Sequence, residues 1–224
     1  MSAIKTICGW GVNDVDYPVQ IKKDLPKVHG KRKREIVWTC PYYLDWKAMI
    51  NRCFNANFHK RSPSYVGCTV SEEWKYLSNF IKWVDSQPNR DWQNCTLDKD
   101  FLVEGNRHYS PETCAYITQK LNKFPTDGKG SGSKLLTGVD FCSRMKTAPF
   151  VASCCNPFIN KREHLGYFTT ELEAHKAWQA KKHELACIYA ELQPDIRVAN
   201  KLRNMYSLDK DLTKYFIDNF VEEF

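Results

Sequence analysis

Apolar residues recur at helical spacing in two stretches of the first half of the chain. Residues 41–54 (PYYLDWKAMINRCF) carry them every three or four positions, with Pro41 in the first turn. Residues 72–86 (EEWKYLSNFIKWVDS) repeat the pattern after Ser71, a residue type that caps helices. The two stripes are Tyr43, Trp46, Met49, Ile50 and Cys53, and then Trp74, Leu77, Phe80, Ile81 and Val84. They predict two helices packed on a core.

The second half shows short strand-like stretches and then one long helical pattern. The strand candidates are residues 136–145 (LTGVDFCSRM), 149–156 (PFVASCCN) and 162–169 (REHLGYFT), with turn residues between them. Thr170, followed by Glu173 three residues later, predicts a capping box at the start of a helix. The expected inner face of this helix is Ala174, Ala177, Trp178, Lys181 through its stem, Leu185, Ile188 and Leu192. Pro194 then interrupts the pattern.

These elements predict an α+β protein. Gly and Pro break any periodicity in residues 1–39, which indicates an irregular arm with a basic character. Residues 40–125 form the first expected domain, and residues 126–137 (with Gly and Ser over 128–133) the linker. A module of three antiparallel strands and a helix is expected over 138–193. A helical tail is expected over 194–224, where three Phe residues come four apart.

Composition excludes several classes of protein. The chain has 224 residues, of which 42% are hydrophobic, too many for a mostly disordered protein. No apolar run approaches the roughly 20 residues that cross a membrane, and the N-terminus lacks the pattern of a secretory signal. We therefore expect a cytoplasmic protein without a membrane partner, whose ten cysteines stay as thiols. No C-x-x-C pair occurs, so a structural zinc is not expected, and no small-molecule cofactor is evident.

The net charge of +7 is concentrated near the N-terminus. The first 62 residues hold 12 Lys and Arg against 5 Asp and Glu, including the run Lys31, Arg32, Lys33 and Arg34. Such a run is typical of a solvated strand or arm, and equally of a surface that binds a phosphate backbone. The sequence leaves both interpretations open.

The strand-and-helix module suggests a surface for DNA. One face of a three-stranded sheet stays uncovered by a single helix, and a curved sheet of this size fits the major groove. The polar candidates on it are Arg144, Lys146, Ser153, Asn156, Lys161, Arg162 and His164. The module also resembles the AP-two/ERF DNA-binding family in Gly138-Val139, PFVAS, HLGYFTT and EAHKAW. The resemblance implies that the sheet lies in the major groove of double-stranded DNA. A module that binds a protein is the alternative.

Residues 97–114 (LDKDFLVEGNRHYSPETC) contain the candidate chemistry of the first domain. They predict a strand, a Gly-Asn turn and a second strand that enters a helix near Pro111. Residues 40–124 resemble phage-encoded HNH-like homing endonucleases, in this stretch, in the two helical stretches and in Asn122. The resemblance implies a ββα-metal hairpin and helix. It also implies metal-dependent cleavage and, if the chain is phage-encoded, the cytoplasm of a bacterial host.

The family resemblance implies specific roles for four residues. Asp98 and Asn122 would hold Mg²⁺ or Mn²⁺, for which oxygen ligands are suited. Where the family places the histidine of an Asp-His pair, this chain has Lys99, flanked by Asp98 and Asp100. Asp98 and Asp100 favour the protonated form of Lys99, so His108 is the expected base and Lys99 a phosphate contact.

Three hypotheses follow from the sequence. The protein is an HNH-like homing endonuclease, a DNA-binding regulator derived from one that no longer cuts, or a module that binds another protein. Lys99 leaves the first two open. The salt dependence of binding distinguishes the third hypothesis from the first two, because affinity for DNA phosphates falls steeply as the salt concentration rises.

Overall fold

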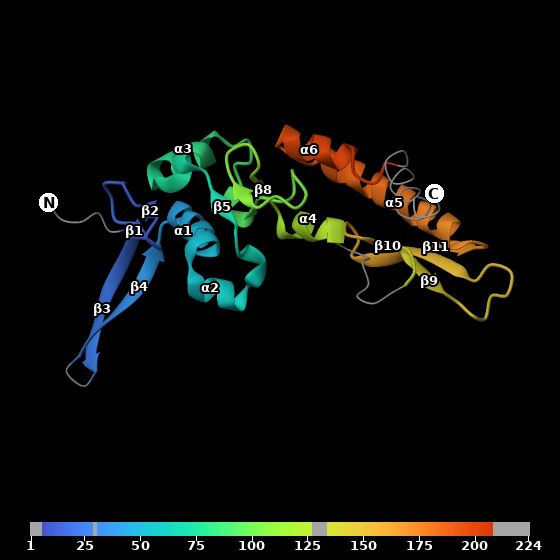
Figure 1. The fold of residues 1–224 in the computed structure, drawn as a ribbon, viewed down its shortest axis with the longest axis horizontal. Helices are drawn as coiled ribbons and strands as arrows, with labels where there is room; N and C mark the ends of the chain where they lie inside the picture. The colour runs from blue at the N-terminus through green and yellow to red at the C-terminus, as the bar shows by residue number, and fades with distance from the viewer. Residues whose placement is uncertain (1–5, 29–30, 127–133, 208–224) are drawn as a thin grey trace, which may run out of the picture. The chain divides into compact units, whose positions relative to one another are not determined.

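The structure is a computed structural model that describes residues 6–28, 31–126 and 134–207. The described residues form an α+β protein with six α-helices and several small, mostly antiparallel sheets, as Figure 1 shows. The chain divides into two compact units, 1–117 and 118–224. The division falls before the predicted linker, most of which (127–133) lies outside the described residues.

The early division has a physical cause in helix α4 (Gln119–Lys123) and the 3-10 turn Phe124–Thr126 that follows it. The Phe124 ring packs edge-on against Tyr189, with ring centroids 5.2 Å apart. The ammonium group of Lys182 donates a hydrogen bond to the Phe124 carbonyl at 2.9 Å. These contacts tie α4 to the second unit, so the division at 117/118 comes before the predicted end of the first domain at residue 125.

The N-terminal arm is regular, which corrects the prediction of an irregular segment. Strands β1 (Thr6–Ile7) and β2 (Gly11–Val12) pair, and β3 (Gln20–Val28) pairs antiparallel with β4 (Lys31–Thr39). The long β3–β4 ribbon is visible in Figure 1. Pro26 lies at an irregularity of the ladder between Leu25 and Val28, where its missing N–H breaks no regular bond. The proline therefore interrupts the ladder locally, and the two strands pair on both sides of it.

The two predicted helical stripes form the core of the first unit. Helix α1 (Pro41–Phe54) buries Trp46 completely, and α3 (Leu77–Ser86) does the same with Phe80. The indole N–H of Trp46 donates to the Trp74 carbonyl at 2.7 Å, which joins α1 to the segment that precedes α3. The second stripe begins in a 3-10 turn, Glu72–Lys75, and becomes α-helical only at Leu77. Three smaller elements complete this region: α2 (Ala56–Arg61) and the 3-10 turns Pro63–Tyr65 and Trp92–Asn94.

The stretch from 96 to 117 differs from the predicted hairpin and helix. Strand β6 (Thr96–Asp98) pairs antiparallel with β8 (Ala115–Ile117), whereas β7 (His108–Tyr109) pairs parallel with β5 (Thr69–Val70). Residues 111–113 form a turn instead of starting a helix. The Ser110 carbonyl accepts a bond from the Cys114 N–H at 3.0 Å and closes this turn. The following residues, Ala115–Ile117, are all buried, and the chain enters the core as a strand.

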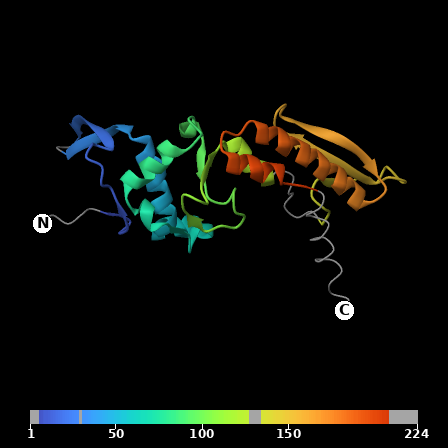
Figure 2. The same cartoon turned by 90° about the horizontal axis from the view of Figure 1, so that it is seen from above.

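The second unit confirms the predicted order of three strands and a helix. Strands β9 (Val139–Phe141), β10 (Phe150–Asn156) and β11 (Lys161–Phe168) form an antiparallel sheet in the order β11-β10-β9. Helix α5 (Glu171–Glu191) begins at the predicted capping box and lies along one face of this sheet, as Figures 1 and 2 show. Buried Ala152 and Ala174 allow the close approach of helix and sheet.

The C-terminal half of α5 buries only part of the predicted face. Leu185 is buried as predicted, but Ile188 and Leu192 are exposed, and the other buried residues are Lys182, Ala186 and Tyr189. Helix α6 (Ile196–Arg203) packs against α5 and covers a face that the sheet does not reach. The predicted helix with three phenylalanines lies outside the described residues. In the part of the chain that the structure describes, no helix has the length and apolar character needed to cross a membrane.

Candidate nucleic-acid interface

The sheet of the second unit has one face covered by α5 and one that α5 leaves open. Residues paired across an antiparallel ladder share a face, and successive residues alternate between faces. Ala152 and Cys154 are buried toward α5, so the residues between and beside them point outward. The outer face therefore carries the pairs Val151 with Tyr167, Ser153 with His164, and Cys155 with Arg162, and also Asp140, which pairs with Val151.

Arg162 is fixed in position on this outer face. Its Nε donates to the Ser153 hydroxyl and a terminal nitrogen donates to the Asp140 carboxylate, both at 2.6 Å. These bonds use two of the five N–H donors of a guanidinium, and the side chain stays 58% exposed. An exposed arginine held by two partners loses little conformational entropy when it binds a planar acceptor.

An aromatic pair lies beside Arg162. The His164 and Tyr167 rings meet edge-on with centroids 4.9 Å apart, and both residues are exposed. The ladder shifts between Ala152 and Ser153, which leaves Leu165 as an extra residue on β11. Strict alternation would place Gly166 on the face of His164. The bulge places Tyr167 there instead, which the sequence could not show.

The other predicted DNA contacts lie around this row instead of on it. Arg144 and Lys146 are exposed in the connection from β9 to β10, and Lys161 is exposed at the start of β11. Asn156 lies on the side of α5, where its amide donates to the Glu163 carboxylate at 2.7 Å. This bond, followed by one from Lys181, lowers the pKa of Glu163. Of the seven candidates, the structure brings Ser153, Arg162 and His164 together.

The predicted basic run lies in β4 of the first unit. Lys33 pairs with Leu25, and Arg34 pairs with Asp24, whose carboxylate it contacts at 2.8 Å. Because neighbouring residues of a strand point to opposite faces, Lys33 and Arg34 lie on opposite sides of the ribbon. Lys31 and Arg32 belong to the same strand, but their side chains lie outside the described residues. The basic run is thus part of a strand, and its side chains are divided between the two faces of the β3–β4 ribbon.

Lys99 and Asp98 hold the loop that follows β6. The Lys99 side chain is 10% exposed, and its ammonium group donates to the Asp100 carboxylate and to the Asn106 carbonyl. One carboxylate oxygen of Asp98 accepts the backbone N–H groups of Asp100 and Phe101 at 2.8 and 2.7 Å. Asn106 completes this network with bonds to the carbonyls of Lys99 and His108. These hydrogen bonds all lie within residues 98–108 and stabilise the loop.

The remaining predicted residues of the metal site do not join Asp98 in one described cluster. His108 is exposed, and its Nδ1 lies 2.8 Å from the Thr69 hydroxyl. Asn122 belongs to α4 in the second unit, whereas Asp98 belongs to the first. Among the described residues, no three His, Cys, Asp or Glu side chains gather as metal ligands do. One carboxylate oxygen of Asp98 already caps a turn.

Two thiols of the first unit are deeply buried. Burial raises the pKa of both Cys53 and Cys114 to about 12. In the metal-free protein these two groups are therefore thiols at neutral pH. The predictions of a divalent metal and of no structural zinc both stay predictions.

Comparisons with family models, with curated proteins and with solved structures give no match for this chain. The resemblances to the AP-two/ERF and HNH-like families therefore rest on the residues that carry them.

Proposed function

We propose that this protein binds double-stranded DNA by placing the outer face of the β9–β10–β11 sheet in the major groove. The observation that carries the proposal is Arg162, exposed on this face and held by Ser153 and Asp140. An arginine in such a position can donate two bonds to one guanine, the commonest specific contact in the major groove. The neighbouring His164 and Tyr167 add a donor and an apolar ring.

The arrangement of the module supports the proposal as well. Three antiparallel strands with one helix on the opposite face agree with the AP-two/ERF architecture, in which the sheet contacts DNA. In this proposal, Arg144, Lys146 and Lys161 at the margins of the sheet contact phosphates. The β3–β4 ribbon contributes Lys33, from one of its two faces, to the flanking duplex.

We expect Arg162→Gln to weaken binding to a specific duplex by about 10- to 100-fold, since a bidentate contact to a base contributes about 1–3 kcal/mol. Titration of labelled duplex fragments from the region of its own gene, followed by fluorescence anisotropy, measures this change. Arg203→Gln is a matched control, because Arg203 also pairs with an exposed carboxylate, that of Glu191 at 3.0 Å. Equal affinities of the two variants would contradict the assignment of Arg162.

The absolute affinity and its salt dependence test the proposal as a whole. We expect the logarithm of the binding constant to fall linearly with the logarithm of the salt concentration, because phosphate contacts release counterions. If no duplex is bound at low salt, DNA binding is wrong. A partner protein whose affinity depends little on the salt concentration would then favour the hypothesis that the chain binds another protein.

Within this proposal the protein binds DNA without cutting it. The support is that Lys99 and Asp98 already bond within their own loop. We expect retarded, full-length DNA on gels with Mg²⁺, with Mn²⁺ and with EDTA. Defined cuts that need the metal and disappear in Asp98→Ala would instead favour the endonuclease.

A further inference from the structure

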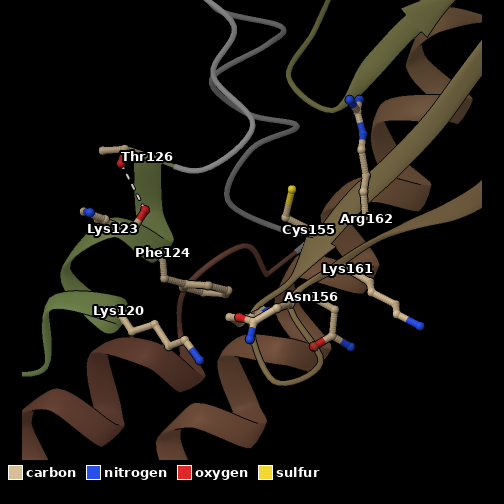
Figure 3. Close-up of a pocket in the computed structure, with 10 residues that line it drawn as sticks. Lys120, Lys123, Phe124, Thr126, Cys155, Asn156, Lys161 and Arg162 are labelled. Atoms are coloured by element: carbon tan, nitrogen blue, oxygen red, sulfur yellow. Dashed lines mark hydrogen bonds between the residues drawn. The ribbon is translucent and has the colours of Figure 1, made fainter.

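A basic cleft lies beside the sheet, within the second unit. Its volume is about 700 Å³, and it separates α4 and the turn after it from the end of β10 and the start of β11, as Figure 3 shows. None of the ten residues that line it is acidic. Four are basic: Lys120, Lys123, Lys161 and Arg162.

The charge of this cleft is largely uncompensated in the described structure. Arg162 pairs with Asp140, but no ion pair of Lys120, Lys123 or Lys161 occurs among the residues that the structure describes. Figure 3 shows the Lys120 side chain extending from α4 toward the other side of the cleft, whereas Lys123, Lys161 and Arg162 point away from the cleft in different directions. Like charges around an open hollow raise the local potential and attract anions.

The shape of the cleft favours a chain of phosphates over a single enclosed anion. The cleft is open to solvent, so it would not enclose a small phosphate. The four basic side chains are exposed and point in different directions around the cleft, so an extended anion can contact several of them and a small one cannot. Cys155 and Arg162 belong both to this cleft and to the outer face of the sheet. A DNA strand in contact with the outer face of the sheet would therefore also reach the cleft.

We infer that this cleft binds the phosphodiester backbone of the DNA strand next to the sheet, through Lys120, Lys123 and Lys161. This inference rests on the proposed function and assigns to α4 a part in the interface that the sequence did not indicate. Backbone contacts set the register of a protein on the duplex and carry no direct sequence information. The cleft thus contributes affinity, and the sheet contributes the choice of site.

The test is the double variant Lys120→Gln/Lys123→Gln in the full chain, with a duplex fragment that the unchanged protein binds. Each lost phosphate contact reduces the slope of log affinity against log salt by about 0.9, so we expect a slope shallower by about 2. We also expect an affinity about tenfold weaker at constant salt, and an unchanged ratio between preferred and scrambled duplexes.

The matched control is Lys176→Gln/Lys201→Gln, which removes the same charge from α5 and α6, away from the cleft. If both double variants change the slope equally, the effect is one of net charge and the inference is wrong. An unchanged slope in the cleft variant also overturns it, while DNA binding stands. Absence of DNA binding by the unchanged protein overturns the proposed function itself.

A second arm of the experiment separates DNA from free phosphate compounds. Tripolyphosphate carries the same chemistry without a duplex, and its binding can be measured by calorimetry. We expect no measurable binding at concentrations at which DNA is bound. Tight tripolyphosphate binding that depends on Lys120 and Lys123 would overturn the assignment to a DNA backbone.

Discussion

Replacing Gly138 with alanine is expected to lower the free energy of unfolding of the second unit by about 3 kcal/mol. Gly138 has a φ of +81°, where a residue with a side chain is strained. A Cβ there would lie 2.1 Å from two ring atoms of Trp178. Trp178 is 5% exposed and packs against His175 and Tyr206, so its ring has little room to move. Backbone strain and overpacking against Trp178 therefore both lower the free energy of unfolding of the variant.

Chemical denaturation followed by far-UV circular dichroism measures this loss. Gly105→Ala is a suitable control, since Gly105 has a φ of +71° but no atom within 4 Å of the added Cβ. It should cost only the strain of the left-handed backbone, about 1 kcal/mol. Because Gly138 precedes β9, its alanine variant should also lose DNA binding near the temperature at which the unit unfolds. Equal stabilities of the two variants would contradict the close packing of Gly138 on Trp178.

Local patterns in the sequence predicted the elements that depend on local interactions. The capping box at Thr170 needs only residues within one turn, and the stripe through Trp46 needs only helical spacing. The three strands and their order before α5 were also predicted, since alternation and turn residues mark each one. These predictions succeeded because the residues that define each element lie close together in the sequence.

Elements that depend on distant partners were not predicted. The β3–β4 ribbon was missed because Pro26 and Gly30 indicate a break, and the ladder accommodates the proline at an irregularity. The helix expected near Pro111 is a turn, since Ala115–Ile117 pairs with β6. Ile188 is exposed because α6 covers another side of α5. In each case, the choice between two local patterns was made by tertiary contacts.

The candidate interface was predicted in part, for the same reason. The polar residues predicted to contact DNA included Ser153, Arg162 and His164, which the structure brings to one face. Asp140 and Tyr167 were missed, because Asp140 reaches this face through the pairing of β9 with β10 and Tyr167 through the bulge at Leu165. The basic cleft combines α4 with the β10–β11 turn, which lie far apart in the sequence. The site is thus easier to predict within one strand than between elements.

Lys99→Ala is expected to destabilise the first unit by about 2–4 kcal/mol. The change removes a buried ammonium group that donates to the Asp100 carboxylate and, at 2.7 Å, to the Asn106 carbonyl. It also removes a side chain whose ammonium lies 5.9 Å from the Tyr109 ring centre. Lys82→Ala, on the exposed side of α3, should change stability by less than about 0.5 kcal/mol. Denaturant titration of both variants measures the difference.

The same variant decides between two roles for Lys99. As part of the loop, Lys99 affects stability, so Lys99→Ala should retain the DNA affinity of the unchanged protein at temperatures where it stays folded. Lys99→Met keeps the aliphatic stem and should recover part of the loss, because the packing survives and only the hydrogen bonds are missing. As a phosphate contact, Lys99 would show the opposite result: unchanged stability and weaker DNA binding. Its low exposure and its two acceptors within the loop favour the first outcome.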